Sequence, residues 1–272
     1  MDSTDLPQIS KKVRCQILEM IFGAGSGHLA GPLSSVDILV SLYFGGIMNK
    51  NDKFVLSCGH YAPALYAVLA NAGKFPEKEL KTFGQLGTRL QAHPHNLDLS
   101  GIETSSGPLG LGLSQSAGLA LGIKPNRIYC LMSDGEQNEG GVWETVMFSA
   151  KYKLDNLCAI IDKNGIQIDG KTQEIMPTED LAAKYLAFGW EVFEIDGHVF
   201  GQILNALEFA KTVKDKPVVI IARTVAGKGV SFMEGKWEWH HASLSSEMYK
   251  KAISELENSK HEIRNPKQIQ KS

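Results

Sequence analysis

Two polar turns of this sequence carry side chains suited to binding a hard metal ion. Asp134 follows the apolar run Ile128–Met132, and Asn164 follows a second apolar run, Leu157–Ile161. A carboxylate, an amide oxygen and a nearby backbone carbonyl are the oxygen ligands that Mg²⁺ or Ca²⁺ takes in proteins, often with a phosphorylated ligand and water completing the shell. The pattern therefore predicts a site for a metal ion and a phosphorylated ligand.

The elements around these turns predict how the two side chains meet. Short apolar runs indicate buried strands, and the segment between them has a helical pattern with Val142, Val146 and Ala150 on one face. A strand–helix–strand unit crosses over with parallel strands, so both turns open at the same edge of the sheet. Backbone amides at the start of the helix after Gly135 would face the anion. Taken alone, Asp134 could equally be a helix N-cap and Asn164 a turn residue.

The two turns also resemble a known signature. The letters SDG, followed 30 residues later (164 − 134) by the Asn of KNG, resemble the thiamine diphosphate motif, and NGIQIDG is similar to its transketolase version. The resemblance implies that Asp134, Asn164 and the backbone carbonyl of Ile166 bind the metal and that Gly135 contacts the cofactor. Ser133 replaces the usual first glycine of the motif, and its small size should have little effect.

Four histidines follow glycine-rich turns or lie in loops, where they could reach a ligand. The segments GSGH, CGH, HPH and WHHASL resemble transketolase blocks. The resemblance implies that these histidines bind sugar hydroxyls and move protons, and that two of them, His60 and His240, also contact the cofactor. Three positions depart from the family pattern, with Leu29 and Ser243 in place of proline and His241 in place of glycine. The four histidines concerned are His28, His60, His93 and His240.

The segment GPLG resembles the loop through which the family contacts the cofactor by backbone atoms, which assigns Gly107, Pro108 and Leu109 to cofactor binding. Without the family, the segment is an ordinary glycine-rich turn before a helix. Glu139 matches a family glutamate between two cofactors and is a candidate catalytic residue. Its alternative interpretation is a solvated residue in the first turn of a helix, favoured there by the helix dipole.

Two glycine-rich segments fail the nucleotide-binding patterns that they suggest. In GAGSGH, the last position of GxGxxG is His28, and no convincing strand precedes the segment. In TVAGKG, a P-loop would need glycine at position 222 and serine or threonine at position 229, where the sequence has Ala222 and Gly229. Neither segment therefore predicts a nucleotide site.

Further apolar runs at 53–57, 190–195 and 217–222 predict additional strands that alternate with helices. We expect an α/β fold, an open and mostly parallel sheet with helices on both faces, and the resemblance implies the diphosphate-binding type of that fold. Polar residues follow these strands as well, at the carboxyl edge where such sheets bind ligands. We expect one domain over residues 1–257 and a frayed polar tail over residues 258–272, and we interpret His198 as structural.

Composition narrows the function further. The chain has 272 residues and a net charge of −2, which gives no electrostatic reason to expect nucleic acid. No run of eighteen apolar residues predicts a membrane helix, and no signal pattern opens the chain, so we expect a cytoplasmic protein. The four cysteines lack CxxC spacing, and Cys130 and Cys158 lie within apolar runs as expected of core residues.

The resemblance extends from residue 8 to about residue 250 but covers only the diphosphate-binding half of a transketolase. It implies transfer of a two-carbon ketol unit between sugar phosphates, with thiamine diphosphate and with magnesium or, as an alternative, calcium. A separate C-terminal subunit would supply the pyrimidine-binding domain, in an assembly of two copies of each. Two rivals stay open, the α subunit of a 2-oxo-acid dehydrogenase and a non-catalytic paralogue that acts through interactions.

Overall fold

Five parallel strands form the central sheet in the computed structural model, which describes residues 5–258. Their order across the sheet is β2-β3-β4-β8-β7, and every neighbouring pair is parallel. The bounds are β2 Lys53–Leu56, β3 Ile128–Ser133, β4 Leu157–Lys163, β8 Val218–Arg223 and β7 Glu191–Asp196. The predicted α/β class with a parallel sheet is confirmed.

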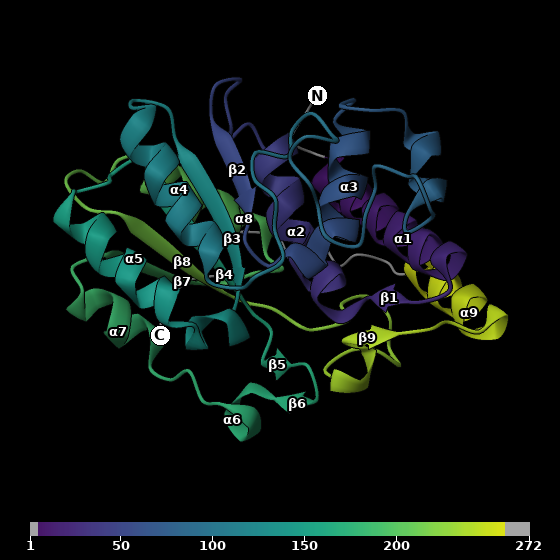
Figure 1. Ribbon diagram of the computed structural model, residues 1–272. Helices are drawn as coiled ribbons and strands as arrows, with labels where there is room; N and C mark the ends of the chain where they lie inside the picture. The colour runs from purple at the N-terminus through teal and green to yellow at the C-terminus, as the bar shows by residue number, and fades with distance from the viewer. Residues whose placement is uncertain (1–4, 259–272) are drawn as a thin grey trace.

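Helices cover both faces of this sheet (Figure 1). One face packs against α4 (Leu111–Gly122), α5 (Gly140–Lys151) and α7 (Leu181–Ala187), and the other against α2 (Ala30–Phe44), α3 (Ala62–Asn71) and α8 (Phe200–Ala210). Successive residues of β3 and β4 point into opposite cores, which is why both strands appear in the sequence as unbroken apolar runs.

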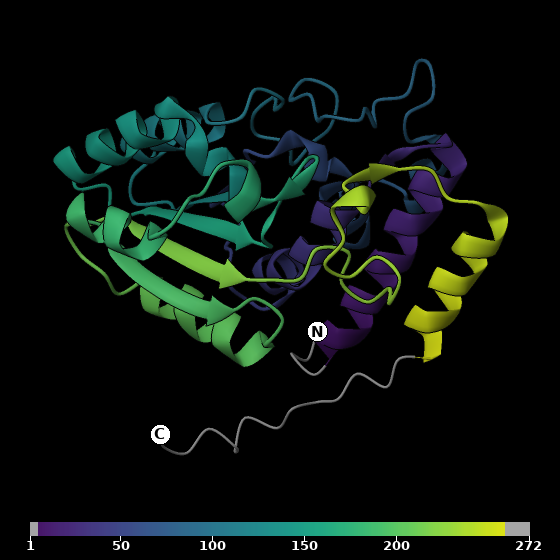
Figure 2. The same ribbon diagram turned by 90° about the horizontal axis from the view of Figure 1, so that it is seen from below.

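A second layer of helices lies beyond α2 and α3. Helix α1 (Leu6–Ala24) packs on both of them, and α9 (Ser246–Asn258) packs on α1, so the two ends of the described chain lie side by side (Figure 2). Residue 258 ends α9, and the rest of the predicted polar tail lies outside the described residues. No helix in residues 5–258 combines the length and apolar character that a membrane crossing requires.

One local feature differs from the sequence predictions, and the starts of two further helices have local causes. The backbone after Asp134 first forms a 3₁₀ turn, Gly135–Asn138, and α5 begins only at Gly140, so no α-helix starts directly after Gly135. Helix α7 begins at Leu181, because Asp180 is its N-cap and accepts a hydrogen bond from the Ala183 amide at 3.2 Å. Helix α2 begins at Ala30, so Ser34 and Ser35 lie within the helix and not at its start.

Two short antiparallel pairs, absent from the predictions, lie beside the carboxyl ends of the strands. Strand β1 (Gly27–His28) pairs with β9 (His241–Ala242), and β5 (Ile166–Gln167) pairs with β6 (Gly170–Lys171), which leads into α6 (Thr172–Ile175). Figure 1 shows both pairs outside the main sheet, at the end where the parallel strands stop. Two-residue strands have too little periodicity to be found in a sequence, yet both pairs shape the ligand-binding edge.

Candidate active site

Asp134 lies at the carboxyl end of β3 with its carboxylate almost completely buried, at 1% exposure. Its Oδ1 accepts a hydrogen bond from the Gly135 amide at 2.8 Å. Its Oδ2 accepts hydrogen bonds from the Gly165 amide at 2.8 Å and from Thr172 Oγ1 at 3.1 Å. Burial, with the nearby carboxylate of Asp162 adding to it, raises the pKa of Asp134 to about 6. The carboxylate is therefore held by neutral donors, and burial disfavours its charged form.

Asn164 lies at the end of the neighbouring strand, and its amide group has a fixed orientation. The Nδ2 atom donates to Asp162 Oδ2 at 2.8 Å and to Tyr61 Oη at 2.9 Å, while Oδ1 accepts from the Ile166 amide at 3.0 Å. Nδ2 also donates to Ser34 Oγ at 3.4 Å, and these contacts fix the amide. The amide oxygen accepts one hydrogen bond, which leaves it a second lone pair for a ligand.

The network that fixes Asn164 centres on Asp162, a fully buried carboxylate on β4. It accepts hydrogen bonds from Ser34 Oγ at 2.6 Å, Tyr61 Oη at 2.7 Å and Thr224 Oγ1 at 2.5 Å, in addition to Asn164. Burial raises its pKa as well. Asp162 thus connects α2, β4 and the end of β8 beneath the predicted metal ligands. From the sequence we assigned no role to Asp162.

The third predicted ligand, the carbonyl of Ile166, belongs to the β5–β6 pair. Gly165 has φ +77°, a conformation that glycine adopts easily, and its carbonyl accepts from the Thr172 amide at 2.9 Å. The Ile166 side chain is buried in a small cluster with Ala30 and Ala226. The pair therefore brings Thr172 to Asp134 and anchors Ile166 against α2 and the segment after β8.

The donor set around Asp134 fits a hard divalent cation that also binds a diphosphate. No basic side chain of residues 5–258 forms an ion pair with Asp134, so this buried carboxylate lacks a counter-charge. In the same residues no group of three or more His, Cys, Asp and Glu side chains is arranged for a metal, so an ion here would depend on amide, carbonyl and ligand oxygens. A pocket of about 280 Å³ lies beside Asp134 and is lined also by Lys163 and Lys171, whereas Asn164 and Ile166 do not line it.

The loop containing Gly107, Pro108 and Leu109 approaches the same edge from the β2 side. A side chain at Gly59 would meet Ser106 Cβ at 2.8 Å, His93 Cδ2 at 2.9 Å and the Gly107 amide at 3.0 Å. Only glycine at position 59 therefore allows the loop and His93 to lie so close to the end of β2.

Glu136 holds this loop in place, and no sequence pattern had pointed to it. The side chain is fully buried, and its carboxylate accepts hydrogen bonds from the Gly110 amide at 2.7 Å, the Ser133 amide at 3.3 Å and the Ser57 hydroxyl. Burial raises its pKa. Glutamate is rarely buried so fully, and only its place two residues after Asp134 in the sequence could have suggested a role.

Glu139 is exposed at the N-cap of α5, and its side chain caps no backbone amide there. A Cβ at Gly110 would lie 2.7 Å from Glu139 Cβ, so the start of α4 and the start of α5 meet at this point. Within residues 5–258, the carboxylate of Glu139 forms no ion pair. The position fits both a residue that faces another chain and the solvated alternative.

The four predicted histidines come together around His28. The centroid of its ring lies 5.1 Å from that of His60, 5.3 Å from that of His240 and 6.0 Å from that of His93, and the rings of His60 and His240 are 5.3 Å apart. His241 is a fifth member, with its ring centroid 4.8 Å from that of His28. In the sequence His241 stood out only as a departure from the family glycine.

The β1–β9 pair creates this imidazole cluster, which we define as His28, His60, His93, His240 and His241. His28 is in register with His241, and the Leu29 amide donates to the His240 carbonyl at 3.2 Å. Although its neighbours in the sequence depart from the family pattern, His240 is therefore held directly beside His28. The pair joins residues near opposite ends of the chain, which is why no local pattern reveals it.

The imidazole cluster keeps its buried rings neutral. Burial, reinforced by repulsion from His240, His241 and His93, lowers the pKa of His28 to about 3. Burial also lowers the pKa of His60 well below its ordinary value, and it lowers the pKa values of His93 and His240. A neutral imidazole offers one donor and one acceptor nitrogen, which is the complement of a hydroxyl group.

Comparison with known proteins identifies the family of this chain. Residues 7–271 match the family described as the transketolase, thiamine diphosphate binding domain. The chain belongs to the transketolase family. It is 43% identical over 266 residues to a 6-deoxy-6-sulfo-D-fructose transketolase subunit of a Clostridium species, covering 93% of this chain and 96% of that subunit. It is 39% identical over 260 residues to an apulose-4-phosphate transketolase subunit from Phocaeicola vulgatus, covering 91% and 92% of the two chains.

Solved transketolase structures agree with this assignment. The transketolase of Leishmania mexicana superposes with a TM-score of 0.87 at 29% identity over 93% of this chain, and that of Campylobacter jejuni with 0.86 at 32% over 94%. The chain covers only 41% and 43% of those two proteins. It is therefore a transketolase-type enzyme subunit that corresponds to the diphosphate-binding part of longer transketolases. These matches favour transketolase over the rival 2-oxo-acid dehydrogenase subunit.

Proposed function

We propose that this subunit binds thiamine diphosphate with magnesium and, with a second chain, transfers a two-carbon ketol unit between sugar phosphates. Asp134 supports the proposal most directly, because it is a buried carboxylate without a counter-charge at the ligand-binding edge of a parallel sheet. A divalent cation would supply that charge and would return the carboxylate to its ionised form. Calcium could occupy the same oxygen ligands.

On this proposal Asp134, the Asn164 amide oxygen and the Ile166 carbonyl hold the metal. Gly135 and the loop of Gly107, Pro108 and Leu109 then contact the diphosphate side of the cofactor. When bound, thiamine diphosphate supplies the electron sink needed to break the carbon–carbon bond beside a carbonyl. The subunit would hold the cation, line the site and exclude water from it.

The imidazole cluster would orient the sugar. Because their pKa values are lowered, His28, His60 and His240 are better suited to hydrogen bonding with hydroxyl groups than to taking up protons near pH 7. His60 and His240 lie deep enough to contact the cofactor as well. His93, at the exposed rim, would meet the substrate first on its way in. Neutral rings carry no positive charge to attract a phosphate, and we propose that the second chain binds the substrate phosphate.

The second chain is the remaining requirement of the proposal. The chain covers about two fifths of the full-length transketolases, and two similar proteins of its own length are named as subunits. We propose a partner that carries the pyrimidine-binding domain, in an assembly of two copies of each chain. Glu139, exposed beside Gly110, would then face the second cofactor site across the assembly.

Calorimetric titration of thiamine diphosphate with Mg²⁺ tests the proposal. The titrated samples are a mixture of this chain with the partner that co-purifies with it and, as a control, this chain alone. Binding in the mixture that requires Mg²⁺ is expected, followed by ketol transfer from a ketose phosphate to an aldose phosphate. Absence of binding in both samples would refute the proposal and favour the non-catalytic paralogue.

A further inference from the structure

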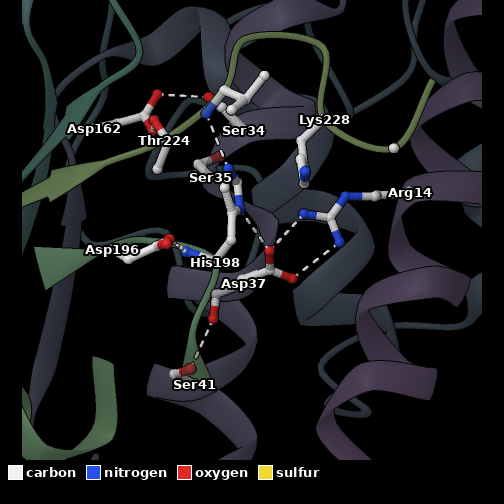
Figure 3. Close-up of polar contacts among 12 residues, drawn as sticks. Arg14, Ser34, Ser35, Asp37, Ser41, Asp162, Asp196, His198, Thr224 and Lys228 are labelled. Atoms are coloured by element: carbon white, nitrogen blue, oxygen red, sulfur yellow. Dashed lines mark hydrogen bonds and ion pairs between the residues drawn. The ribbon is translucent and has the colours of Figure 1, made fainter. Parts of the chain in front are cut away.

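Beneath the candidate site, a buried polar network joins three elements through one histidine (Figure 3). Asp37 of α2 accepts two hydrogen bonds from Arg14 of α1, from Nη1 to Oδ1 at 2.9 Å and from Nη2 to Oδ2 at 2.7 Å. His198, in the turn after β7, lies with Nδ1 2.8 Å from Asp37 Oδ2. Arg14 and Asp37 are 2% and 5% exposed, so the ion pair is removed from solvent.

The hydrogen bonds of His198 fix the protonation of its ring. The Val225 amide donates to His198 Nε2 at 2.9 Å, so Nε2 carries no proton. The proton of the neutral ring is therefore on Nδ1, where it is donated to Asp37. The His198 amide also donates to Asp196 Oδ1 at 2.9 Å, which holds the backbone of the turn. One ring thus connects a buried carboxylate to a single backbone amide.

That amide belongs to the segment that leads from β8 toward the active site. Next to Val225, Ala226 is fully buried against Ala30 and Ile166, the residue whose carbonyl is the predicted metal ligand. The Gly227 amide donates to the Ala30 carbonyl at 2.9 Å. Ala30 itself follows His28 by two positions. The segment 225–227 therefore contacts both Ile166 and the start of α2 at Ala30.

The turn after β7 is built for this close approach. The Gly197 amide donates to the Arg223 carbonyl at 2.7 Å, and a Cβ at Gly197 would lie 2.5 Å from Thr224 Cγ2. Any side chain at position 197 would push the turn, and His198 with it, away from Val225. The turn, the end of β8 and the network under α2 thus form one rigid arrangement.

Stability alone is a weak explanation for such a network. A buried ion pair seldom stabilises a fold more than apolar residues of the same volume would, whereas it can specify one arrangement of the backbone. Here the specified feature is the path of the chain at Val225, because the imidazole has no other bonding partner on its Nε2 side among residues 5–258.

We propose that His198 is a positioning residue of the active site, which sets the segment 225–227 through the Val225 amide and so aligns Ile166 with the chain around His28. This inference rests on the proposed function, since the site that it aligns is the one proposed to bind the cofactor. From the sequence we interpreted His198 as structural. The proposal specifies this structural role as the positioning of the segment 225–227.

Two substitutions test the two hydrogen bonds of the His198 ring one at a time. Asparagine places a donor near the position of Nδ1 and keeps the bond to Asp37, but it cannot reach Val225. Glutamine places an acceptor near the position of Nε2 and keeps the bond from Val225, but it loses the donor to Asp37. The variants His198→Asn and His198→Gln therefore test which bond serves the site.

The first measurement is amide hydrogen exchange over residues 224–230 in the full chain without cofactor, with β3 and β4 as internal reference. We expect faster exchange in His198→Asn and exchange close to wild type in His198→Gln. The second measurement is cofactor affinity and kcat in the complex with the partner. We expect a loss of about 10-fold in His198→Asn, the effect typical of removing an outer-shell partner of a site, and recovery of most of it in His198→Gln.

Wild-type exchange over residues 224–230 in His198→Asn, or equal losses of affinity in both variants, would overturn the positioning role. A wild-type mixture that fails to bind the cofactor would instead overturn the proposed function. The exchange data are obtained without cofactor, so the two failures can be told apart.

Discussion

The acidic side of the site, around Asp134 and Asp162, and the imidazole cluster around His28 lie at the same edge of the sheet and differ in what their buried groups lack. The two carboxylates accept hydrogen bonds from amides and hydroxyls, and neither forms an ion pair within residues 5–258. The five imidazoles have no hydrogen-bond partner for their rings among residues 5–258. The carboxylates of the acidic side lack an ion-paired cation within residues 5–258. The rings of the imidazole cluster lack hydrogen-bonding groups, such as hydroxyl groups, within the same residues.

Burial acts on the two sides in opposite directions. It raises the pKa of Asp134 to about 6 and lowers that of His28 to about 3, because in each case the charged form loses its hydration. The difference teaches that burial alone can favour the protonated form of an acid and the neutral form of a base at the same edge of a sheet. Substitutions on each side should therefore have separable effects.

The largest effect is expected from removing the charge of Asp134. In Asp134→Asn the shape of the side chain stays, but the carboxylate that would hold the metal is lost. We expect Mg²⁺-dependent affinity for thiamine diphosphate to fall by at least about 100-fold, beyond the range found for outer-shell partners. Calorimetry on the complex with the partner measures it, with circular dichroism to show an unchanged fold. Unchanged affinity would remove Asp134 from the ligand set.

The second prediction concerns the pH dependence of stability. His28 has a folded pKa of about 3, below the ordinary value of 6.5, so the unfolded chain binds more protons between these values. The free energy of unfolding should therefore fall as the pH falls from 6.5 toward 3, with a limiting slope of about 1.4 kcal/mol per pH unit for each such group. Denaturant unfolding of wild type and His28→Asn measures it, and the variant should show the shallower slope.

Asp134 should have the opposite effect on the pH dependence of stability in the same experiment. Its folded pKa of about 6 lies above the ordinary value of 3.8, so the folded chain binds more protons between these values, and stability from this group rises as the pH falls. The variant Asp134→Asn should therefore lose stability more steeply on acidification than wild type does. A shallower slope in this variant would contradict the contrast between the two sides.

A smaller effect is expected at Glu136, which supports the acidic side from behind. In Glu136→Gln an amide nitrogen would face donors at Gly110, Ser57 or Ser133, leaving one hydrogen bond unmade. We expect a loss of about 1–3 kcal/mol in the free energy of unfolding and weaker cofactor binding through the loop that contains Gly107. Urea unfolding measures the first and calorimetry the second. Full stability at pH 7 would mean that Glu136 is protonated there.

The smallest effect is expected at the rim of the imidazole cluster. His241→Gly restores the family residue and removes an exposed ring beside His28. We expect KM for the sugar to change by less than about 10-fold, as for the loss of one hydrogen-bonding group, with cofactor affinity unchanged. Steady-state kinetics with one donor and several acceptors measures it. A large change in cofactor affinity instead would place His241 on the cofactor side of the cluster.

The acidic side was largely predictable from the sequence, because its residues follow strands whose apolar runs are unmistakable. Asp134 and Asn164 needed only the strand–helix–strand pattern to be placed at one edge. The supporting carboxylates were not predictable. In the sequence, Asp162 and Glu136 are polar residues in segments that resemble turns. Their burial depends on tertiary contacts with Tyr61, Ser57 and Gly110.

Four of the five histidines of the imidazole cluster were predicted, and only through the family resemblance; His241 was not. Each histidine follows an irregular segment, and no periodicity links positions so far apart in the chain. The β1–β9 pair that aligns His28 with His241 is two residues long, and the network of His198 depends on hydrogen bonds between three elements. Such features arise from the packing of loops at the edge of the folded sheet. Local sequence patterns do not encode this packing.

The pairing of β1 with β9 also has a consequence for biogenesis. Strand β3 and the turn of Asp134 are synthesised well before His240 and His241. The acidic half of the site is completed by Thr224 and Ala226, which follow β8, whereas the imidazole half also requires β9. The imidazole half is therefore the last part of the site to form as the chain is synthesised.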